Sequence, residues 1–146
     1  MDAIQIRPMS LSDYDDVIAI MKEMDGVVLR NADSRDSIER YLRRNPDCSF
    51  VAVDGAAIIG CIMSGHDGRR GYLHHLAVLP AYRRRGVAAS LVEHCMDALE
   101  RDGIQKFHID VLQGNVAAQQ YWEGRGWQLR TDIHRYSFVR SGGENA

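Results

Sequence analysis

Cysteine is scarce in this sequence, with three residues in a chain of 146. Cys48, Cys61 and Cys95 lie far apart, and no two of them have the CxxC spacing of a zinc or redox motif. An odd and widely spaced set argues against a disulfide framework and against structural zinc. We therefore expect a cytoplasmic protein without a metal site, in which Cys61 and Cys95 are ordinary core residues.

Long apolar runs and an excess of one charge are also missing. No stretch approaches the ~18 apolar residues of a transmembrane helix, and we expect no signal peptide at the start. The formal net charge is −2, so the composition does not indicate binding to nucleic acid or to an anionic membrane. The 45% of hydrophobic residues can bury one core, and we expect a single domain over 1–140 with a flexible tail over 141–146.

Hydrophobic periodicity predicts an α/β (α+β) fold. The expected strands are 3–7, 49–53, 57–63, 72–78, 106–111 and two closing strands at Leu129 and 133–139. The expected helices are one between Ser12 and Gly26, one that begins after Ser34 or Ser37 and ends before Pro46, and two more at 86–100 and 116–125. This order indicates a mixed, mostly antiparallel central sheet of six to seven strands with helices on both faces.

One turn in the middle of the chain carries most of the functional information. A buried strand ends near Val78, a short loop with three arginines at 83–85 follows, and Gly86 opens a helix. The first turn of a helix presents unpaired N–H groups and partial positive charge, so a pyrophosphate fits there. Gly86 and the small Ala88 would let the backbone approach such a ligand closely, and the arginines would add phosphate donors.

Two common phosphate-binding loops do not match this turn. A dinucleotide-binding loop needs G-x-G-x-x-G after the first strand, and a P-loop ends in Gly-Lys-Ser or Gly-Lys-Thr. Neither pattern occurs here. From the spacing alone, an ordinary strand–loop–helix with surface arginines stays open as the alternative.

The stretch from Tyr72 to Trp127 resembles the GCN5-related N-acetyltransferases in two motifs. The first motif is (Arg/Gln)-x-x-Gly-x-(Gly/Ala) after a strand that ends in Ala-Val-x-Pro, and residues 83–88 and 77–80 match both parts. The second is an Asn…Ala…(Tyr)-Glu-x-x-Gly-(Phe) segment, which residues 115–127 resemble. The order of elements along the chain also agrees with this family.

The resemblance implies an acyl-CoA N-acyltransferase fold with acetyl-CoA as cosubstrate and no metal. A β-bulge on the strand before the turn would separate it from the next strand and make a slot for the pantetheine arm. Backbone groups at 76–78 would hold this arm and the thioester, and residues 83–89 would surround the pyrophosphate. The cofactor-binding residues implied are Leu76, Ala77, Val78, Arg83, Arg84, Arg85, Gly86, Val87, Ala88, Ala89, Asn115 and Trp122.

His74 is our first candidate for the general base, because acetyl transfer needs a neutral amine. Strand alternation places His74 on one face and Leu73, His75 and Ala77 on the other. The arylalkylamine branch of the family carries a catalytic histidine at a similar place. Imidazole titrates near pH ~6.5, which suits the task. The alternative is that His74 or His75 is a buried, hydrogen-bonded structural histidine.

Asp110 is the competing candidate base, since protein N-terminal acetyltransferases of the family often carry a glutamate near this place. The alternative is an aspartate that closes a strand. Family members with a tyrosine acid place it where this chain has Trp122, which cannot donate a proton usefully. Tyr121 precedes it by one residue, about 100° away on a helix, and is kept as a secondary candidate acid. Otherwise solvent protonates the leaving thiolate.

The acceptor site is expected in the loop 25–37 and in the loop before the last strands. Arg30 and Asp33 are candidate acceptor contacts, with ordinary loop charges as the alternative. We expect acetylation, by direct attack in a ternary complex, of a primary amine on a small molecule, a protein N-terminus or a lysine. The alternatives are an acyl-CoA-binding sensor without turnover and, more remotely, a nucleic-acid-binding protein that uses the arginines. A homodimer is kept open.

Overall fold

The computed structural model describes residues 3–24 and 27–146, which form two compact units. The first unit ends at Ile109, and the second is Asp110–Ala146. The expected end of the first helix at Gly26 lies outside the described residues. None of the helices in the described part is long and apolar enough to cross a membrane.

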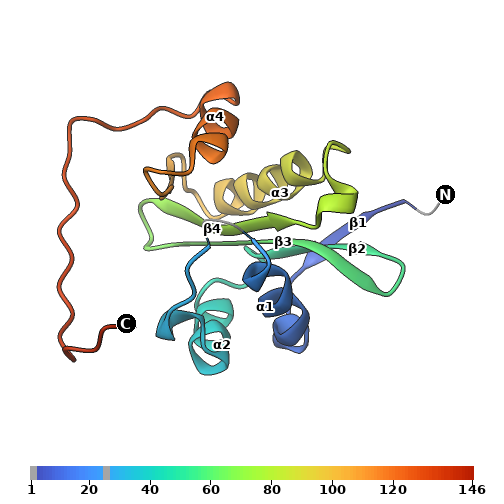
Figure 1. Ribbon diagram of the computed structural model, residues 1–146, viewed down its shortest axis with the longest axis horizontal. Helices are drawn as coiled ribbons and strands as arrows, with labels where there is room; N and C mark the ends of the chain where they lie inside the picture. The colour runs from blue at the N-terminus through green and yellow to red at the C-terminus, as the bar shows by residue number, and fades with distance from the viewer. Residues whose placement is uncertain (1–2, 25–26) are drawn as a thin grey trace. The chain divides into compact units, whose positions relative to one another are not determined.

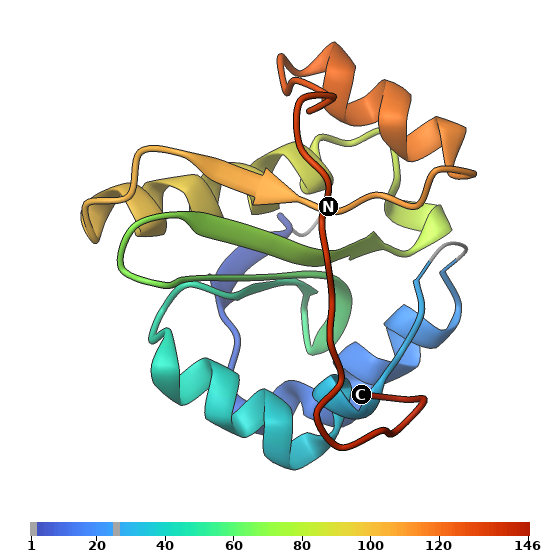
Figure 2. The same cartoon turned by 90° about the vertical axis from the view of Figure 1, so that its left-hand side faces the viewer.

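The first unit is a sheet covered by helices on both faces (Figures 1 and 2). Its strands are β1 (Gln5–Pro8), β2 (Phe50–Asp54), β3 (Ala57–His66), β4 (Gly71–Val78) and β5 (Phe107–Ile109). Its α-helices are α1 (Tyr14–Lys22), α2 (Arg35–Arg44) and α3 (Val87–Arg101), and its short 3-10 turns are η1 (Leu11–Asp13), η2 (Asn31–Asp33) and η3 (Pro80–Tyr82). In both views α1 and α2 lie on one side of the sheet and α3 on the other.

The strands follow one another across the sheet in the order β1-β2-β3-β4-β5. The first three pairs are antiparallel, whereas β4 and β5 are parallel because α3 connects them as a crossover. A mixed, mostly antiparallel sheet with helices on both faces is therefore confirmed.

The predicted number of six to seven strands is wrong, because the described residues form five. The second unit contains the helix α4 (Val116–Gly124), and its residues 125–146, which include the expected strands at Leu129 and 133–139, contain no strand. Figure 1 draws this segment as an extended trace. Apolar alternation reports a local preference for extended backbone, but a strand also needs a hydrogen-bonded neighbour, and Tyr136 and Phe138 are 91% and 87% exposed.

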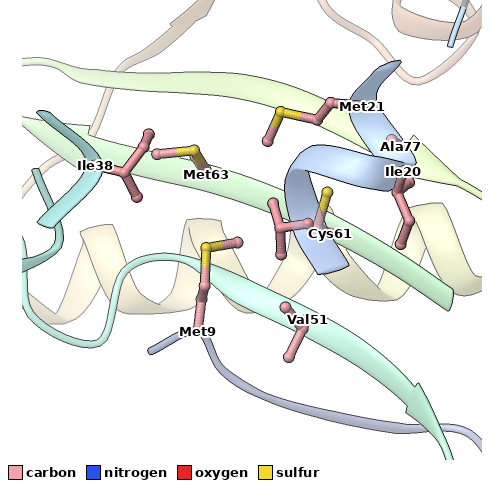
Figure 3. Packing of buried hydrophobic residues seen from close by; sticks show 9 residues of the cluster. Met9, Ile20, Met21, Ile38, Val51, Cys61, Met63 and Ala77 are labelled. Carbon is pink, nitrogen blue, oxygen red and sulfur yellow. The ribbon is translucent and has the colours of Figure 1, made fainter. Parts of the chain in front are cut away.

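The core on one face of the sheet lies under α1 and α2, and Figure 3 shows its side chains pointing toward one another. Its buried members are Met9, Val17, Ile20, Met21, Ile38, Val51, Cys61, Met63 and Ala77. On α3, Leu91, Cys95 and Leu99 are fully buried. Burial raises the pKa of both the Cys61 and the Cys95 thiol to about 12, so these cysteines stay protonated and serve as core residues, as predicted.

The start of α1 differs from the prediction, because the turn η1 precedes it. Ser12 lies inside η1 and does not cap the helix. Asp13 instead accepts the Ser10 N–H at 2.9 Å and both arms of the Arg7 guanidinium, at 2.8 and 2.9 Å. By contrast, the predicted cap of α2 is confirmed at Ser34, whose hydroxyl accepts the Ser37 N–H at 3.2 Å.

We predict that Asp13→Ala lowers the free energy of unfolding by about 2 kcal/mol at neutral pH, because Arg7 and the Ser10 N–H lose a buried acceptor. Hydrogen bonds from Arg7 hold the pKa of Asp13 below its ordinary value although burial opposes this. The carboxylate therefore stabilises the fold fully above the unfolded pKa of ~3.9, and this contribution is lost as the pH falls through the lower folded value.

Urea unfolding of the wild type and the variant at neutral pH and at about pH 2.5 measures this difference. The difference in the free energy of unfolding between wild type and Asp13→Ala should shrink in acid. A difference independent of pH would contradict the role of the Asp13 carboxylate. Asp36→Ala, which removes an exposed acid from the first turn of α2, is the matched control and should cost less than about 1 kcal/mol.

Candidate functional site

The pairing of β3 with β4 changes register near the middle of both strands. Cys61 lies opposite Ala77 and Met63 lies opposite His74, so two steps along β3 face three steps along β4. His75, inside the longer stretch, has a φ of 53°, which is left-handed backbone that few side chains adopt. These are the features of a β-bulge, and the bulge expected before the turn is confirmed.

The bulge changes which side chains of β4 share a face. His74 and Ala77 lie opposite Met63 and Cys61, which both belong to the core under α1 and α2. His74 and Ala77 are therefore on the same face, and the prediction of opposite faces is wrong. Strict alternation fails here because one extra residue shifts the period by one.

Beyond the start of the bulge, β4 has no strand beside it on the β5 side among the described residues. Its pairing with β5 runs from Gly71 opposite Phe107 to Leu73 opposite Ile109, where β5 ends. Residues 74–78 continue without β5. An unpaired strand edge offers N–H and C=O groups to an extended ligand. This is the part of β4 for which the sequence predicts contacts with a pantetheine arm.

The turn after β4 leads into α3 through a left-handed glycine. Gly86 is the N-cap residue, with a φ of 77°. A Cβ at this position would meet no atom within 4 Å, so the space in front of the helix start is open. The first N–H groups of α3 have no acceptor within the helix. A hollow of about 560 Å³, lined in part by Arg85, Val87 and Ser90, adjoins the same helix start.

Two of the three arginine side chains in this turn contact neighbouring parts of the fold. The Arg83 Nε donates to the Val78 carbonyl at 3.1 Å. The Arg85 guanidinium lies over the Tyr82 ring, 5.3 Å from its centre, and the Tyr82 hydroxyl donates to Asp54 at 2.7 Å. These contacts attach the turn before Gly86 to the end of β4 and to Asp54 at the end of β2.

A histidine–aspartate pair joins the bulge to the loop before α2. The His75 Nε2 lies 2.8 Å from Asp33 Oδ1. The other oxygen of Asp33 accepts the Arg30 N–H at 2.9 Å, and the Tyr14 hydroxyl donates to the Asp33 carbonyl at 2.7 Å. Burial alone would raise the pKa of Asp33, but the hydrogen bonds from His75 and Arg30 outweigh it and hold this pKa below its ordinary value.

The sequence did not indicate this pair, since its members are 42 residues apart. It indicated each residue separately, Asp33 as a candidate acceptor contact and His75 as a candidate structural histidine. His74, the first candidate base, is exposed and lies beside the pair, with its ring 6.1 Å from Tyr41 and 6.4 Å from His75. The structure therefore gathers two imidazoles and one carboxylate under α1 and α2.

The other candidate catalytic residues belong to the second unit. Asp110 is exposed and forms an ion pair with Arg135 at 2.6 Å. The Tyr121 hydroxyl is buried and has no hydrogen-bond partner among the described residues. Burial raises the pKa of this hydroxyl, which therefore stays protonated at neutral pH. Their roles in catalysis stay predictions.

The remaining residues predicted to contact the cofactor, Asn115 and Trp122, shape α4. Asn115 is its N-cap residue, and its side-chain oxygen accepts the Ala118 N–H at 3.1 Å. Trp122 is buried and packs edge-on against Trp127, with ring centres 4.8 Å apart. Among the described residues no three His, Cys, Asp or Glu side chains gather as ligands for a metal ion.

Known proteins resemble this chain in sequence and in fold. Residues 14–127 match the model of a family described as the Acetyltransferase (GNAT) family. An acetyltransferase of Yersinia enterocolitica is 32% identical over 130 residues, which cover 89% of this chain and 92% of that protein.

Two solved structures share the fold. The structure of AAC(6')-Iy in complex with the bisubstrate analogue CoA-S-monomethyl-acetylneamine has a TM-score of 0.73 and 21% identity, over 94% of this chain and 99% of that chain. The NatC complex bound to Gag peptide and CoA gives a TM-score of 0.66 and 27% identity, over 86% and 84% of the two chains.

Proposed function

Because this chain belongs to the acetyltransferase (GNAT) family, we propose that it transfers the acetyl group of acetyl-CoA to a primary amine of a small molecule, a protein N-terminus or a lysine. The observation that carries the proposal is the bulged β4 followed directly by the glycine-started helix α3. The first offers an unpaired strand edge to an extended arm, and the second offers unpaired N–H groups to a pyrophosphate.

Acetyl-CoA has the shape and charge that these two features suit. Backbone groups of Leu76, Ala77 and Val78 would bond the amides of the pantetheine arm along the edge that β5 leaves uncovered. The N–H groups at the start of α3, from Gly86 to Ala89, would bind the pyrophosphate, because the open space at Gly86 lets its oxygens come close. Arg84, which is exposed in the same turn, would add a charged donor.

The reaction is a direct attack in a ternary complex. The lone pair of a neutral amine attacks the thioester carbonyl carbon, a C–N bond forms, and the C–S bond breaks as coenzyme A leaves as a thiolate. One proton must leave the amine nitrogen, and His74 or Asp110 are the residues predicted to accept it. Asp110 is paired with Arg135 and would have to give up this ion pair to act, which favours His74 of these two.

The thiolate then needs a proton. Tyr121 is the residue predicted to supply it, and its hydroxyl is protonated at neutral pH. Trp122, at the usual place of the family's tyrosine, has an indole N–H that is too weak an acid to protonate the thiolate usefully. Protonation by water is the alternative, since a thiolate of coenzyme A is a fairly good leaving group.

Two of the proposed acceptor classes, a small-molecule amine and a peptide, are represented among the structural neighbours. The AAC(6')-Iy structure holds a bisubstrate analogue of CoA and acetylneamine, and the NatC structure holds a peptide and CoA. Trp122 also favours a second candidate function, in which the domain binds acyl-CoA as a sensor without turnover. Both functions require the cofactor site, and turnover separates them.

We predict that Gly86→Trp weakens acetyl-CoA binding at least tenfold, because the indole would fill the space in front of the helix start. Calorimetric titration measures the affinity. Gly103→Trp is the matched control, since Gly103 is also left-handed, with a φ of 90° and open space, but lies beyond the other end of α3. Unchanged affinity in Gly86→Trp would contradict the cofactor site.

A second prediction concerns the acceptor. The wild type, supplied with acetyl-CoA and a panel of polyamines, aminoglycosides, amino acids and peptides with free N-termini, should release thiol above the rate of thioester hydrolysis for at least one amine. Mass spectrometry of the product should show one added acetyl group. Tight acetyl-CoA binding with no release for any amine would favour the sensor function instead.

A further inference from the structure

The His75–Asp33 pair has the geometry of a proton acceptor and its positioning residue. His75 extends from the bulge of β4, and Asp33 is the last residue of η2, in the loop where the acceptor is expected. Their contact of 2.8 Å therefore connects the strand proposed to hold the thioester with the segment proposed to hold the amine. No residue of the pair was among the predicted catalytic residues.

Asp33 is held so that its carboxylate faces the imidazole in one orientation. It is nearly buried, at 9% exposure, and both its carboxylate and its carbonyl have donors, from Arg30 and Tyr14. A carboxylate can only accept, so the His75 Nε2 must donate to it. The hydrogen-bond network thereby assigns the proton of neutral His75 to Nε2, and the basic lone pair is on Nδ1.

The backbone at His75 is strained in a way that aims the side chain. A left-handed φ of 53° is unfavourable for a non-glycine residue, and such positions occur where the surroundings fix the conformation. The bulge turns His75 toward Asp33, away from the position that strict alternation would give it. Its side chain is 21% exposed, so the ring is supported by the fold and still accessible to an amine.

We propose that His75 Nδ1 accepts the proton of the acceptor amine and that Asp33 positions the imidazole and stabilises its charged form. This inference rests on the proposed acetyl transfer. As the amine nitrogen bonds to the acetyl carbon, its N–H proton passes to Nδ1 and the imidazole becomes an imidazolium. The C–S electron pair leaves with coenzyme A, and the imidazolium returns its proton to the thiolate or to water. His75 then replaces His74 as the base.

Other titratable groups face this pair from the neighbouring elements. Tyr14 of α1, Cys61 of β3 and His74 of β4 contact the pair, and Tyr41 of α2 contacts His74. Burial raises the pKa of Tyr14, of Tyr41 and of the Cys61 thiol, so these three stay protonated in the neutral range. His74 is the neighbour that carries a second imidazole, so the test must separate the two histidines.

The test compares kcat as a function of pH for the wild type, His75→Asn, Asp33→Asn and His74→Asn, with the best amine of the panel. Asparagine tolerates left-handed backbone, so His75→Asn removes the base and keeps the bulge. It should lower kcat at neutral pH by about 10²-fold or more with acetyl-CoA affinity unchanged. Thermal unfolding of each variant checks that it is folded.

Asp33→Asn should move the acid limb of the pH profile of kcat to lower pH, because the imidazolium that forms in the reaction loses its negative neighbour. If the pair were merely structural, Asp33→Asn would change stability or KM and leave the acid limb in place. His94→Asn, on the exposed side of α3, is the control and should leave the acid limb unchanged.

The outcomes distinguish this inference from the proposed function. A wild type that releases thiol while His75→Asn keeps its kcat and pH profile would overturn the role of His75. The role of His75 would also be overturned if His74→Asn, but not His75→Asn, removed the acid limb of the pH profile. A wild type that acetylates no amine would remove the proposed function and this inference with it.

Discussion

The extra residue in β4 determines the geometry of everything that follows it along the strand. Two steps of β3 face three of β4, and this mismatch places His74 and Ala77 on one face and puts left-handed backbone at His75. The pairing with β5 ends at Leu73, just before the mismatch. The strand edge that β5 leaves uncovered thus begins beside the bulge that carries His75, so the proposed thioester and amine sites meet at one irregularity.

Two opposite electrostatic arrangements flank this bulge. At the start of α3, backbone N–H groups and the open space at Gly86 favour an anion, and the side chains of Arg83 and Arg85 contact neighbouring parts of the fold. In the loop before α2, a nearly buried carboxylate at Asp33 favours a cation, either the imidazolium or an approaching amine. An acetyl transfer needs both, because its donor is a polyanion and its acceptor gives up a proton.

Much of the first unit was predictable from the sequence, because burial on alternating or helical positions leaves a direct pattern. The strands, the three helices and the Ser34 cap follow from it, and the turn at Gly86 follows from one glycine before an apolar helix. The His75–Asp33 contact could not be predicted, because it depends on an extra residue that the alternation does not reveal. The prediction of a closing strand at 133–139 was wrong for a related reason. Alternation of apolar and polar residues cannot show whether a neighbouring strand is present to pair with.

Amide hydrogen exchange with and without coenzyme A tests the central claim most directly. We expect slower exchange at Val87, Ala88 and Ala89, whose N–H groups have no acceptor within α3, and along 76–78 on β4. The first turn of α2, at Arg35 and Asp36, should not change. Bound coenzyme A that leaves residues 87–89 and 76–78 unprotected would contradict the account.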